Sequence, residues 1–240
     1  MKKNLNVGSK IKQKSGQWSF KSSIVKNFEE HIDQSIPYYK STHDIFARFS
    51  DFFVKKGSIV CDLGCSTGTF LRKIQKRHQD KSIKYIGYDN QKKMIQFAKK
   101  KLTKKHTNIK LFYKDINKIK FPKSSLISSF YTIQFVDTSI RQNLINKIYS
   151  NLTWGGAFFF IEKVRGPDAR FQDMLNQFYH EFKLDNGFSY EEVLNKTISL
   201  KGILEPFSSN GNLSLLKRAG FKDIMTIMRW GCFEGIIAIK

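Results

Sequence analysis

The sequence lacks the features of a secreted or membrane-spanning protein. It has no run of about 18 or more apolar residues, which is the length that a membrane-spanning helix needs. Its first 17 residues are polar and basic, and no apolar segment follows them that would form a signal peptide. We therefore expect a soluble, cytoplasmic protein that does not interact with membranes.

Cysteine is also scarce. The three cysteines are Cys61, Cys65 and Cys232. Cys61 and Cys65 lie four residues apart, and the chain has no second pair of cysteines at the spacing of metal ligands. This pattern predicts reduced thiols and excludes both a disulfide framework and a zinc site. We expect no bound metal.

Acidic residues are few relative to basic ones. The chain has 20 acidic and 42 basic residues, for a net charge of +22. A surface this basic could bind nucleic acid by releasing counterions. However, most of the basic residues are lysines, whereas proteins that recognise nucleic acid favour the planar fork of arginine. The lysines are spread over the whole length, so we interpret them as a compositional bias. A nucleic-acid partner is an open but less favoured alternative.

Apolar runs alternate with helical patterns in the middle of the chain. The predicted strands are residues 57–63, 84–89, 108–115, 125–133 and 156–162, and the helices between them are residues 68–78, 91–103 and 139–152. Short strands separated by helices of ten or more residues are typical of βαβ units and a parallel sheet. Ligands of such sheets bind at the carboxyl ends of the strands.

The two ends of the chain depart from this alternation. Helices are predicted at 168–184, 189–204 and 211–219, followed by strands 222–230 and 232–240 that only Gly231 separates. This spacing predicts an antiparallel hairpin at one edge of the sheet. Near the N-terminus, two helices broken at Pro37 would cover the top of the sheet. The predicted fold is α/β, with a mostly parallel seven-stranded sheet. We expect residues 1–17 to be flexible and residues 18–240 to form a single domain.

A glycine loop follows the first predicted strand. Residues 60–70 read VCDLGCSTGTF, where an apolar run ends in Asp62 and the loop of residues 64–68 opens the next helix. Gly64 and Gly68 would let backbone amides approach a ligand, and the following helix directs its positive dipole end toward it. Asp62, at the lip of this loop, would repel a pyrophosphate and favour a cationic group. The lysine of a Walker loop is missing as well.

Two further carboxylates follow the next two strands. Asp89 lies about 20 residues past the glycine loop, where an acidic residue accepts hydrogen bonds from ribose hydroxyls. Asp115 ends the third strand, near the expected adenine. Each aspartate could instead be a simple helix cap. However, Asp62, Asp89 and Asp115 follow three successive predicted strands, and three carboxylates at equivalent positions favour a ligand-binding role. The pattern suits an adenosine that carries a positive charge and no phosphate, and S-adenosylmethionine is such a molecule.

The chain resembles the class I S-adenosylmethionine-dependent methyltransferases. It resembles more closely the carboxy-S-adenosylmethionine synthase family, whose members use prephenate to carboxylate the cofactor's methyl group for tRNA wobble-uridine modification. The resemblance covers nearly the whole chain, in segments such as SIPYY, DLGCSTG, YDN, INKIYSNLTWGGAFFFIEK and FYHEFKLDNGFSYEEV. It implies a Rossmann-like fold, S-adenosylmethionine as cofactor and a site made of Tyr39, Gly64, Cys65, Ser66, Asp89, Asn90, Asp115 and Ile116. The residue patterns add Asp62, Gly68 and Phe130 to this site, and a homodimer is compatible with the resemblance.

Two positions depart from the family. Thr197 stands where the family has the arginine that pairs with the extra carboxylate, and Phe130 stands where it has an asparagine. Breaking a buried ion pair typically costs about 3–5 kcal/mol, so threonine cannot simply replace the arginine. Arg170 and Arg229 are the candidates for a substitute cation.

These departures favour ordinary methyl transfer to an unidentified small-molecule acceptor. We expect His180 and Tyr131 to be catalytic, with His180 as a general base. The other candidate pocket residues are Trp18, Tyr38, Tyr39, Phe130 and Glu162. Carboxy-S-adenosylmethionine synthesis is the first alternative and requires another cation. A non-catalytic RNA-binding module is the second, and the three retained aspartates argue against it.

Overall fold

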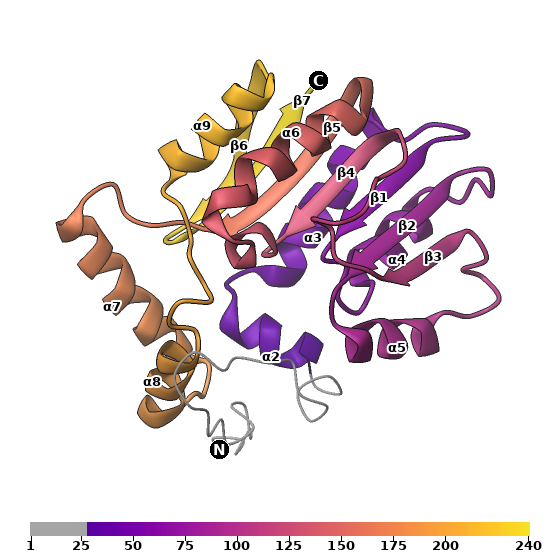
Figure 1. The fold of residues 1–240 in the computed structure, drawn as a ribbon. Helices are drawn as coiled ribbons and strands as arrows, with labels where there is room; N and C mark the ends of the chain where they lie inside the picture. The colour runs from indigo at the N-terminus through magenta and orange to yellow at the C-terminus, as the bar shows by residue number, and fades with distance from the viewer. Residues whose placement is uncertain (1–27) are drawn as a thin grey trace.

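A seven-stranded sheet forms the centre of the protein (Figure 1). The computed structural model describes residues 28–240. The segment 1–17, expected to be flexible, and the candidate pocket residue Trp18 lie outside the described residues.

The sheet is parallel except at one edge. Its strand order is β3-β2-β1-β4-β5-β7-β6, and only the pairs β5–β7 and β6–β7 are antiparallel. The predicted hairpin at one sheet edge is therefore confirmed. The strands are β1 (Ile59–Leu63), β2 (Lys84–Asp89), β3 (Ile109–Tyr113), β4 (Ser124–Phe130), β5 (Leu152–Lys163), β6 (Asp223–Trp230) and β7 (Phe233–Ile239).

Helices cover both faces of the sheet. One face packs against α3 (Tyr39–Phe49), α4 (Thr69–Arg77) and α5 (Lys92–Lys101), and the other packs against α6 (Arg141–Asn151) and α9 (Ser209–Ala219). The alternation of strand side chains fixes this division, because Phe159 belongs to the first core whereas Phe158 and Phe160 belong to the second.

Three further helices lie beyond the carboxyl ends of the parallel strands. They are α2 (Phe28–Ser35), α7 (Ala169–Asp185) and α8 (Tyr190–Ser199) (Figure 1). Local chemistry sets where the last two begin, since Asp168 caps α7 and Ser189 forms a capping box with Glu192 at α8. Within residues 28–240, none of the helices has the length and apolar character needed to cross a bilayer.

Some boundaries differ from the predicted ones. Helix α8 ends at Ser199 rather than at residue 204, and the following turn contains Gly202 with a φ of +71°. Strand β5 begins at Leu152, four residues earlier than predicted, immediately after α6. The two helices predicted around Pro37 are confirmed as α2 and α3, but α3 packs on a face of the sheet and only α2 covers its carboxyl edge.

Candidate active site

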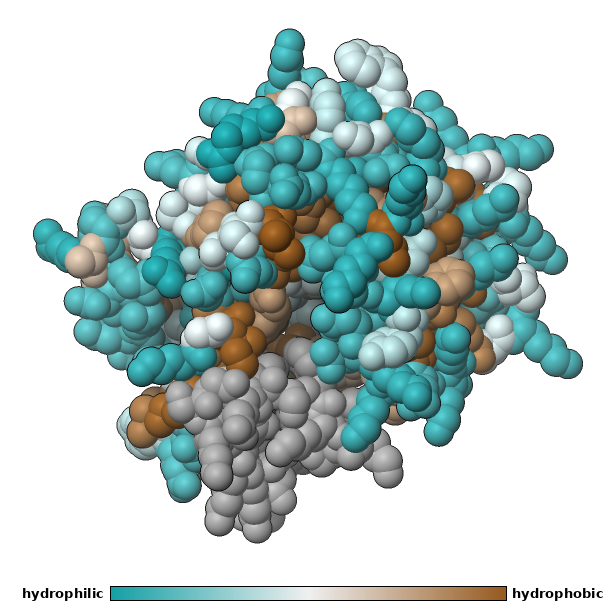
Figure 2. All heavy atoms as spheres, in the orientation of Figure 1, coloured by the Kyte–Doolittle hydropathy of each residue, from teal (hydrophilic) through white to brown (hydrophobic). Residues whose placement is uncertain are grey.

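A large cavity opens at the carboxyl ends of the strands. Its volume is about 1060 Å³, at the upper end of the range of ligand pockets, so it has room for a nucleotide and a second small molecule. Figure 2 shows a hollow with hydrophobic side chains around it on a face that is otherwise mainly hydrophilic. The sheet edge and the glycine loop form one side of the cavity, and α2, α7 and α8 contribute to the other.

The glycine loop has a left-handed backbone conformation at three of its residues. Gly64 and Gly68 have φ angles of +79° and +70°, and Ser66 between them has a φ of +50°. A Cβ atom at Gly64 would lie 2.0 Å from the hydroxyl oxygen of Thr132, so glycine is required there by both conformation and space.

The loop amides do not have the role predicted for them. Gly64 and Cys65 donate their N–H groups to the carbonyl of Tyr88, and Gly68 donates to Cys65. The structure therefore shows amides that hold the loop itself rather than amides directed at a ligand. Gly64, Cys65 and Ser66 border the cavity, but Gly68 does not, because it turns away to begin α4.

Asp89 joins the glycine loop to the end of β2. One carboxylate oxygen accepts the Ser66 N–H and the other accepts the Gln91 N–H, both at 2.8 Å. Burial raises the pKa of Asp89, and these two hydrogen bonds oppose the rise. Each carboxylate oxygen keeps a further lone pair. Asp89 can therefore be both a structural cap and an acceptor for ribose hydroxyls.

The other two aspartates differ in their surroundings. Asp62 is buried in the floor of the cavity, not at its lip, since it is only 4% exposed. Burial raises the pKa of Asp62 to about 7, although Ser128 donates a hydrogen bond of 2.7 Å to it. Asp115 borders the cavity after β3, together with Asn90 and Ile116.

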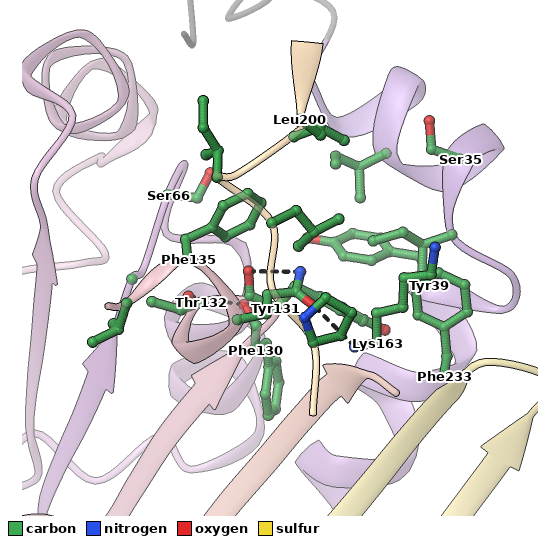
Figure 3. A pocket seen from close by; sticks show the side chains of 18 of the residues that line it. Ser35, Tyr39, Ser66, Phe130, Tyr131, Thr132, Phe135, Lys163, Leu200 and Phe233 are labelled. Atoms are coloured by element: carbon green, nitrogen blue, oxygen red, sulfur yellow. Dashed lines mark hydrogen bonds between the residues drawn. The ribbon is translucent and has the colours of Figure 1, made fainter. Parts of the chain in front are cut away.

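The end of β4 carries an aromatic pair. Phe130 and Tyr131 both border the cavity, and Tyr131 has a φ of +55°. The Tyr131 hydroxyl is buried and has no hydrogen-bond partner within the described part of the chain. The Tyr39 ring lies 6.0 Å from that of Tyr131, and Figure 3 shows both at the centre of the site. A buried hydroxyl without a partner is expected where a ligand supplies one.

Glu162 does not line the cavity, contrary to the prediction. Its carboxylate accepts the N–H groups of Thr132, Ile133 and Gln134 at 2.9–3.1 Å. Burial raises the pKa of Glu162 to about 8, although these three hydrogen bonds favour the charged carboxylate and oppose the rise. Glu162 thus fixes the turn after β4 and does not face a substrate. Tyr38 is also misassigned as a pocket residue, because it is 63% exposed and its ring faces that of Trp230.

His180 borders the cavity from α7. Burial, with smaller effects of Lys183 and Lys163, lowers its pKa, so the imidazole is neutral at neutral pH and able to accept a proton. Its placement is compatible with the predicted role as general base.

The position of the missing arginine also borders the cavity. Thr197 lies on α8, and its hydroxyl donates to the Val193 carbonyl at 2.9 Å. Arg170 and Arg229 do not border the cavity, so neither can replace the arginine there. Arg170 is exposed in the first turn of α7, and Arg229 is on the edge strand β6.

Four lysines in the cavity wall were missed by the sequence analysis. They are Lys163 from β5, Lys183 from α7, Lys196 from α8 and the exposed Lys201 just after α8, and the exposed Arg165 after β5 borders the cavity as well. Lys183 and Lys196 are buried, and their pKa values are lowered by burial to about 6 and about 8. The only sequence signal was that Lys163 directly follows an apolar strand at its carboxyl end.

The residues of the cavity fit S-adenosylmethionine. Asp89 and Asp115 offer acceptors for an adenosine, and the glycine loop beside them contributes no phosphate-binding amide at Gly64, Cys65 or Gly68. When bound, this molecule supplies an activated methyl carbon on its sulfonium. Within the described residues, no group of three or more metal-ligating side chains occurs.

Comparisons with known proteins agree with this arrangement. Residues 60–156 match a family described as "Methyltransferase domain". Among solved structures, an O-methyltransferase family protein from Burkholderia thailandensis has a TM-score of 0.66 at 14% identity, covering 92% of this chain and 60% of that one. Human N-acetylserotonin methyltransferase, in complex with SAM, has a TM-score of 0.61 at 17% identity, covering 92% of this chain and 56% of that one. These likenesses establish the Rossmann-like methyltransferase fold.

Curated relatives are more similar in sequence. The carboxy-S-adenosyl-L-methionine synthase of Staphylococcus epidermidis is 41% identical over 228 residues, covering 93% of this chain and 97% of that protein. The synthase of Sulfurimonas denitrificans is 35% identical over 224 residues, covering 93% and 95%. The chain therefore belongs to the carboxy-S-adenosyl-L-methionine synthase family.

Proposed function

We propose that this protein is a carboxy-S-adenosylmethionine synthase. One observation carries the proposal: a single cavity has an acidic end with Asp89 and Asp115 and a cationic end with Lys163, Lys183 and Lys196. The acidic end suits the adenosine and ammonium groups of S-adenosylmethionine. The cationic end suits carboxylates, both those of a second substrate and the one added to the cofactor.

Electrostatics favours this reaction over plain methyl transfer. The sulfonium of S-adenosylmethionine is a cation, and it would share a poorly solvated cavity with three lysine side chains, each of which repels it when protonated. A carboxylate attached to the methyl carbon neutralises that charge. Although the family arginine is replaced by Thr197, the cavity wall therefore still contains cationic side chains.

The overall reaction balances with prephenate, the substrate that the family resemblance implies. Prephenate loses its ring carboxylate and its hydroxyl and becomes phenylpyruvate. The carboxylate carbon becomes bonded to the methyl carbon of S-adenosylmethionine. The methyl carbon loses one proton, which leaves with the hydroxide as water. We assign the acceptance or relay of that proton to His180, because it borders the cavity and burial lowers the pKa of its imidazole.

Methyl transfer to an anionic acceptor is the second candidate, and Thr197 favours it. The Thr197 hydroxyl is committed to Val193, and no guanidinium replaces the family arginine at that position. In this case the lysines would bind the acceptor only.

Mass spectrometry of the reaction products distinguishes the two candidates. The protein is incubated with S-adenosylmethionine and prephenate, and the nucleoside products are analysed. We expect carboxy-S-adenosylmethionine and phenylpyruvate in equal amounts. If neither forms while S-adenosylmethionine binds, synthase activity is excluded. S-adenosylhomocysteine formed with an added acceptor would support methyl transfer.

A further inference from the structure

Two ammonium groups in the cavity wall share one aromatic ring. Lys163 Nζ lies 4.5 Å and Lys183 Nζ lies 4.1 Å from the centroid of the Tyr179 ring. Lys163 ends β5, whereas Lys183 and Tyr179 lie one turn apart on α7. Segments from the sheet and from the outer helices thus bring two like charges to the same place.

The amino groups of Lys163 and Lys183 have no acidic partner among the described residues. Within residues 28–240, no carboxylate lies within 4.0 Å of either ammonium group. Lys183 is only 5% exposed, and burial together with Lys196 and Lys163 lowers its pKa to about 6, so its amino group is largely uncharged at neutral pH until an anion binds beside it. Like charges that are poorly solvated and unpaired are costly. Such an arrangement is expected where a ligand supplies the opposite charge.

Lys196 completes the arrangement from α8. Its ammonium group donates to the Ser35 hydroxyl at 3.0 Å and lies 3.1 Å from His31 Nε2. The Tyr179 hydroxyl donates to the Ser35 carbonyl at 2.8 Å. Ser35 and Tyr179 thus connect all three lysines, with Lys196 held in place by α2.

A purely structural role for these lysines explains less. Lys147 and Lys240 also lie over aromatic rings, at 4.6 and 4.7 Å from the centroids, and there the cation–π contact suffices. Each of those two donates hydrogen bonds to backbone carbonyls and stands outside the cavity. Lys163 and Lys183 instead border the same cavity together, so their mutual repulsion requires a further explanation.

We infer that Lys163 and Lys183 form an anion-binding subsite that holds a carboxylate of the second substrate. The inference deepens the proposed function and rests on it, because it places the second substrate in the cavity of the cofactor. Lys196 contributes a third positive charge. An ammonium group binds a carboxylate oxygen as a point charge and not through a bidentate fork, so this subsite differs in kind from an arginine clamp.

The surrounding walls favour an organic acid over an inorganic anion. Figure 3 shows Lys163 beside Tyr39 and Phe233, on the opposite side of the site from Ser66 and Phe135. The ring of Phe233 lies 5.2 Å from that of Tyr179. An apolar body attached to the carboxylate would pack on these rings, whereas phosphate would leave them uncovered.

Calorimetry with small probe anions tests this subsite without the cofactor. The whole protein is titrated with malonate, with malonamide as an uncharged molecule of similar size, and with inorganic phosphate. The variants are Lys183→Met and Lys163→Met, with Lys183→Arg as the charge-conserving change and Lys147→Met as the control at a lysine over a ring outside the cavity. Circular dichroism and thermal unfolding verify that each variant is folded.

We expect malonate to bind the parent protein more tightly than phosphate does, and malonamide not to bind. Each methionine variant at the subsite should weaken malonate binding by about tenfold to a hundredfold, the range for a hydrogen bond to a charged group. Lys183→Arg and Lys147→Met should bind malonate within a few-fold of the parent. Folding should persist in Lys183→Met, since methionine is apolar and replaces a buried amino group whose charged form is disfavoured.

Three outcomes would overturn the subsite: no malonate binding to the parent, unchanged binding in both methionine variants, or phosphate binding as tightly as malonate. Binding of S-adenosylmethionine is measured separately on the same proteins. If the cofactor does not bind while malonate does, the proposed function fails and the carboxylate subsite stands. If the cofactor binds and malonate does not, only the subsite fails.

Discussion

The carboxylate of Glu29, on the covering helix α2, accepts a hydrogen bond of 2.9 Å from the hydroxyl of Thr67 in the glycine loop. The same oxygen accepts hydrogen bonds from Thr69 at 2.8 Å and from Lys101 at 2.7 Å. A single side chain thus holds the cover to the loop, to α4 and to α5. These partners lower the pKa of Glu29 to about 2, although partial burial opposes them.

Replacing Glu29 with glutamine should loosen the cover. The amide keeps an acceptor oxygen but loses the charge, and because Glu29 is partly exposed we expect a loss of at most about 1 kcal/mol at neutral pH. The depressed pKa of the parent contributes stability that is present above pH 4.5 and is lost as the pH falls toward 2. Thermal unfolding from pH 6 to pH 2 should therefore show a shallower decline for Glu29→Gln. Glu30→Gln, at the exposed neighbouring residue, is the control, and an unchanged acid profile for Glu29→Gln would contradict the prediction.

Asp89 should control both the affinity for the cofactor and the shape of the loop. Asp89→Asn loses the charged acceptor for ribose, which is worth roughly 1.5–3 kcal/mol of binding, or about tenfold to a hundredfold. Because Asp89 also accepts the N–H groups of Ser66 and Gln91, we expect a measurable loss of stability as well. Calorimetry with S-adenosylmethionine and thermal unfolding measure the two effects.

Asp80 offers a matched control for that change. It accepts the Ser82 N–H at 2.8 Å in a similar local turn, but it is exposed and does not border the cavity. Asp80→Asn should lower stability slightly and leave cofactor binding unchanged. If Asp89→Asn binds S-adenosylmethionine like the parent, the ribose does not lie at Asp89.

Thr197→Arg should increase the preference for the carboxylated cofactor. The position borders the cavity next to Lys196, so a guanidinium there adds the bidentate partner that the family has. We expect the ratio of affinities for carboxylated over plain S-adenosylmethionine to rise about tenfold or more, the value of a charged hydrogen bond. Phe130→Asn should add a further hydrogen bond.

Competition binding of the two cofactors provides this measurement, with Thr197→Met as an uncharged control. The parent protein alone already distinguishes the two candidate functions. If the cavity lysines bind the added carboxylate, the parent should bind the carboxylated cofactor more tightly than the plain one. A preference for the plain cofactor would favour methyl transfer.

Stability should rise with pH because of Lys183. Burial and the nearby charges of Lys196 and Lys163 lower its pKa from 10.5 to about 6, and Cys232 opposes them only weakly. Between about pH 6 and 10.5 the unfolded chain binds this proton and the folded chain does not, so the folded state gains stability across that window. Lys183→Met should flatten the rise in thermal stability, whereas Lys92→Met, at an exposed lysine in the first turn of α5, should not. A profile of Lys183→Met that parallels the parent would refute a depressed pKa.

The edge of the sheet that borders the cavity could be predicted from the sequence. Asp89 and Asp115 border the cavity, as a carboxylate after a short apolar run predicts for the end of a parallel strand, and the hairpin followed from Gly231 alone. The hydrogen bonds of the glycine loop could not be predicted, since amides that bind a ligand and amides that close a turn require the same glycines.

The far wall of the cavity could not be predicted at all. A lysine in a helical pattern indicates solvent, and Lys183 and Lys196 are buried only because α7 and α8 meet α2. Tyr38 and Tyr39 are adjacent in sequence and point to different places, because Tyr38 takes a left-handed backbone conformation at the start of α3. Neither fact has a local signature.

The contacts that close the cavity join very distant parts of the chain. Tyr179 reaches Ser35 across 144 residues, and Lys196 reaches His31 across 165. Neither contact can form until both segments are present, and closing such long loops costs entropy. On the ribosome, the wall made by α7 and α8 cannot exist until most of the chain has been synthesised. A ligand that contacts both walls would bind only the state in which they meet, so it would stabilise the closed cavity against local opening.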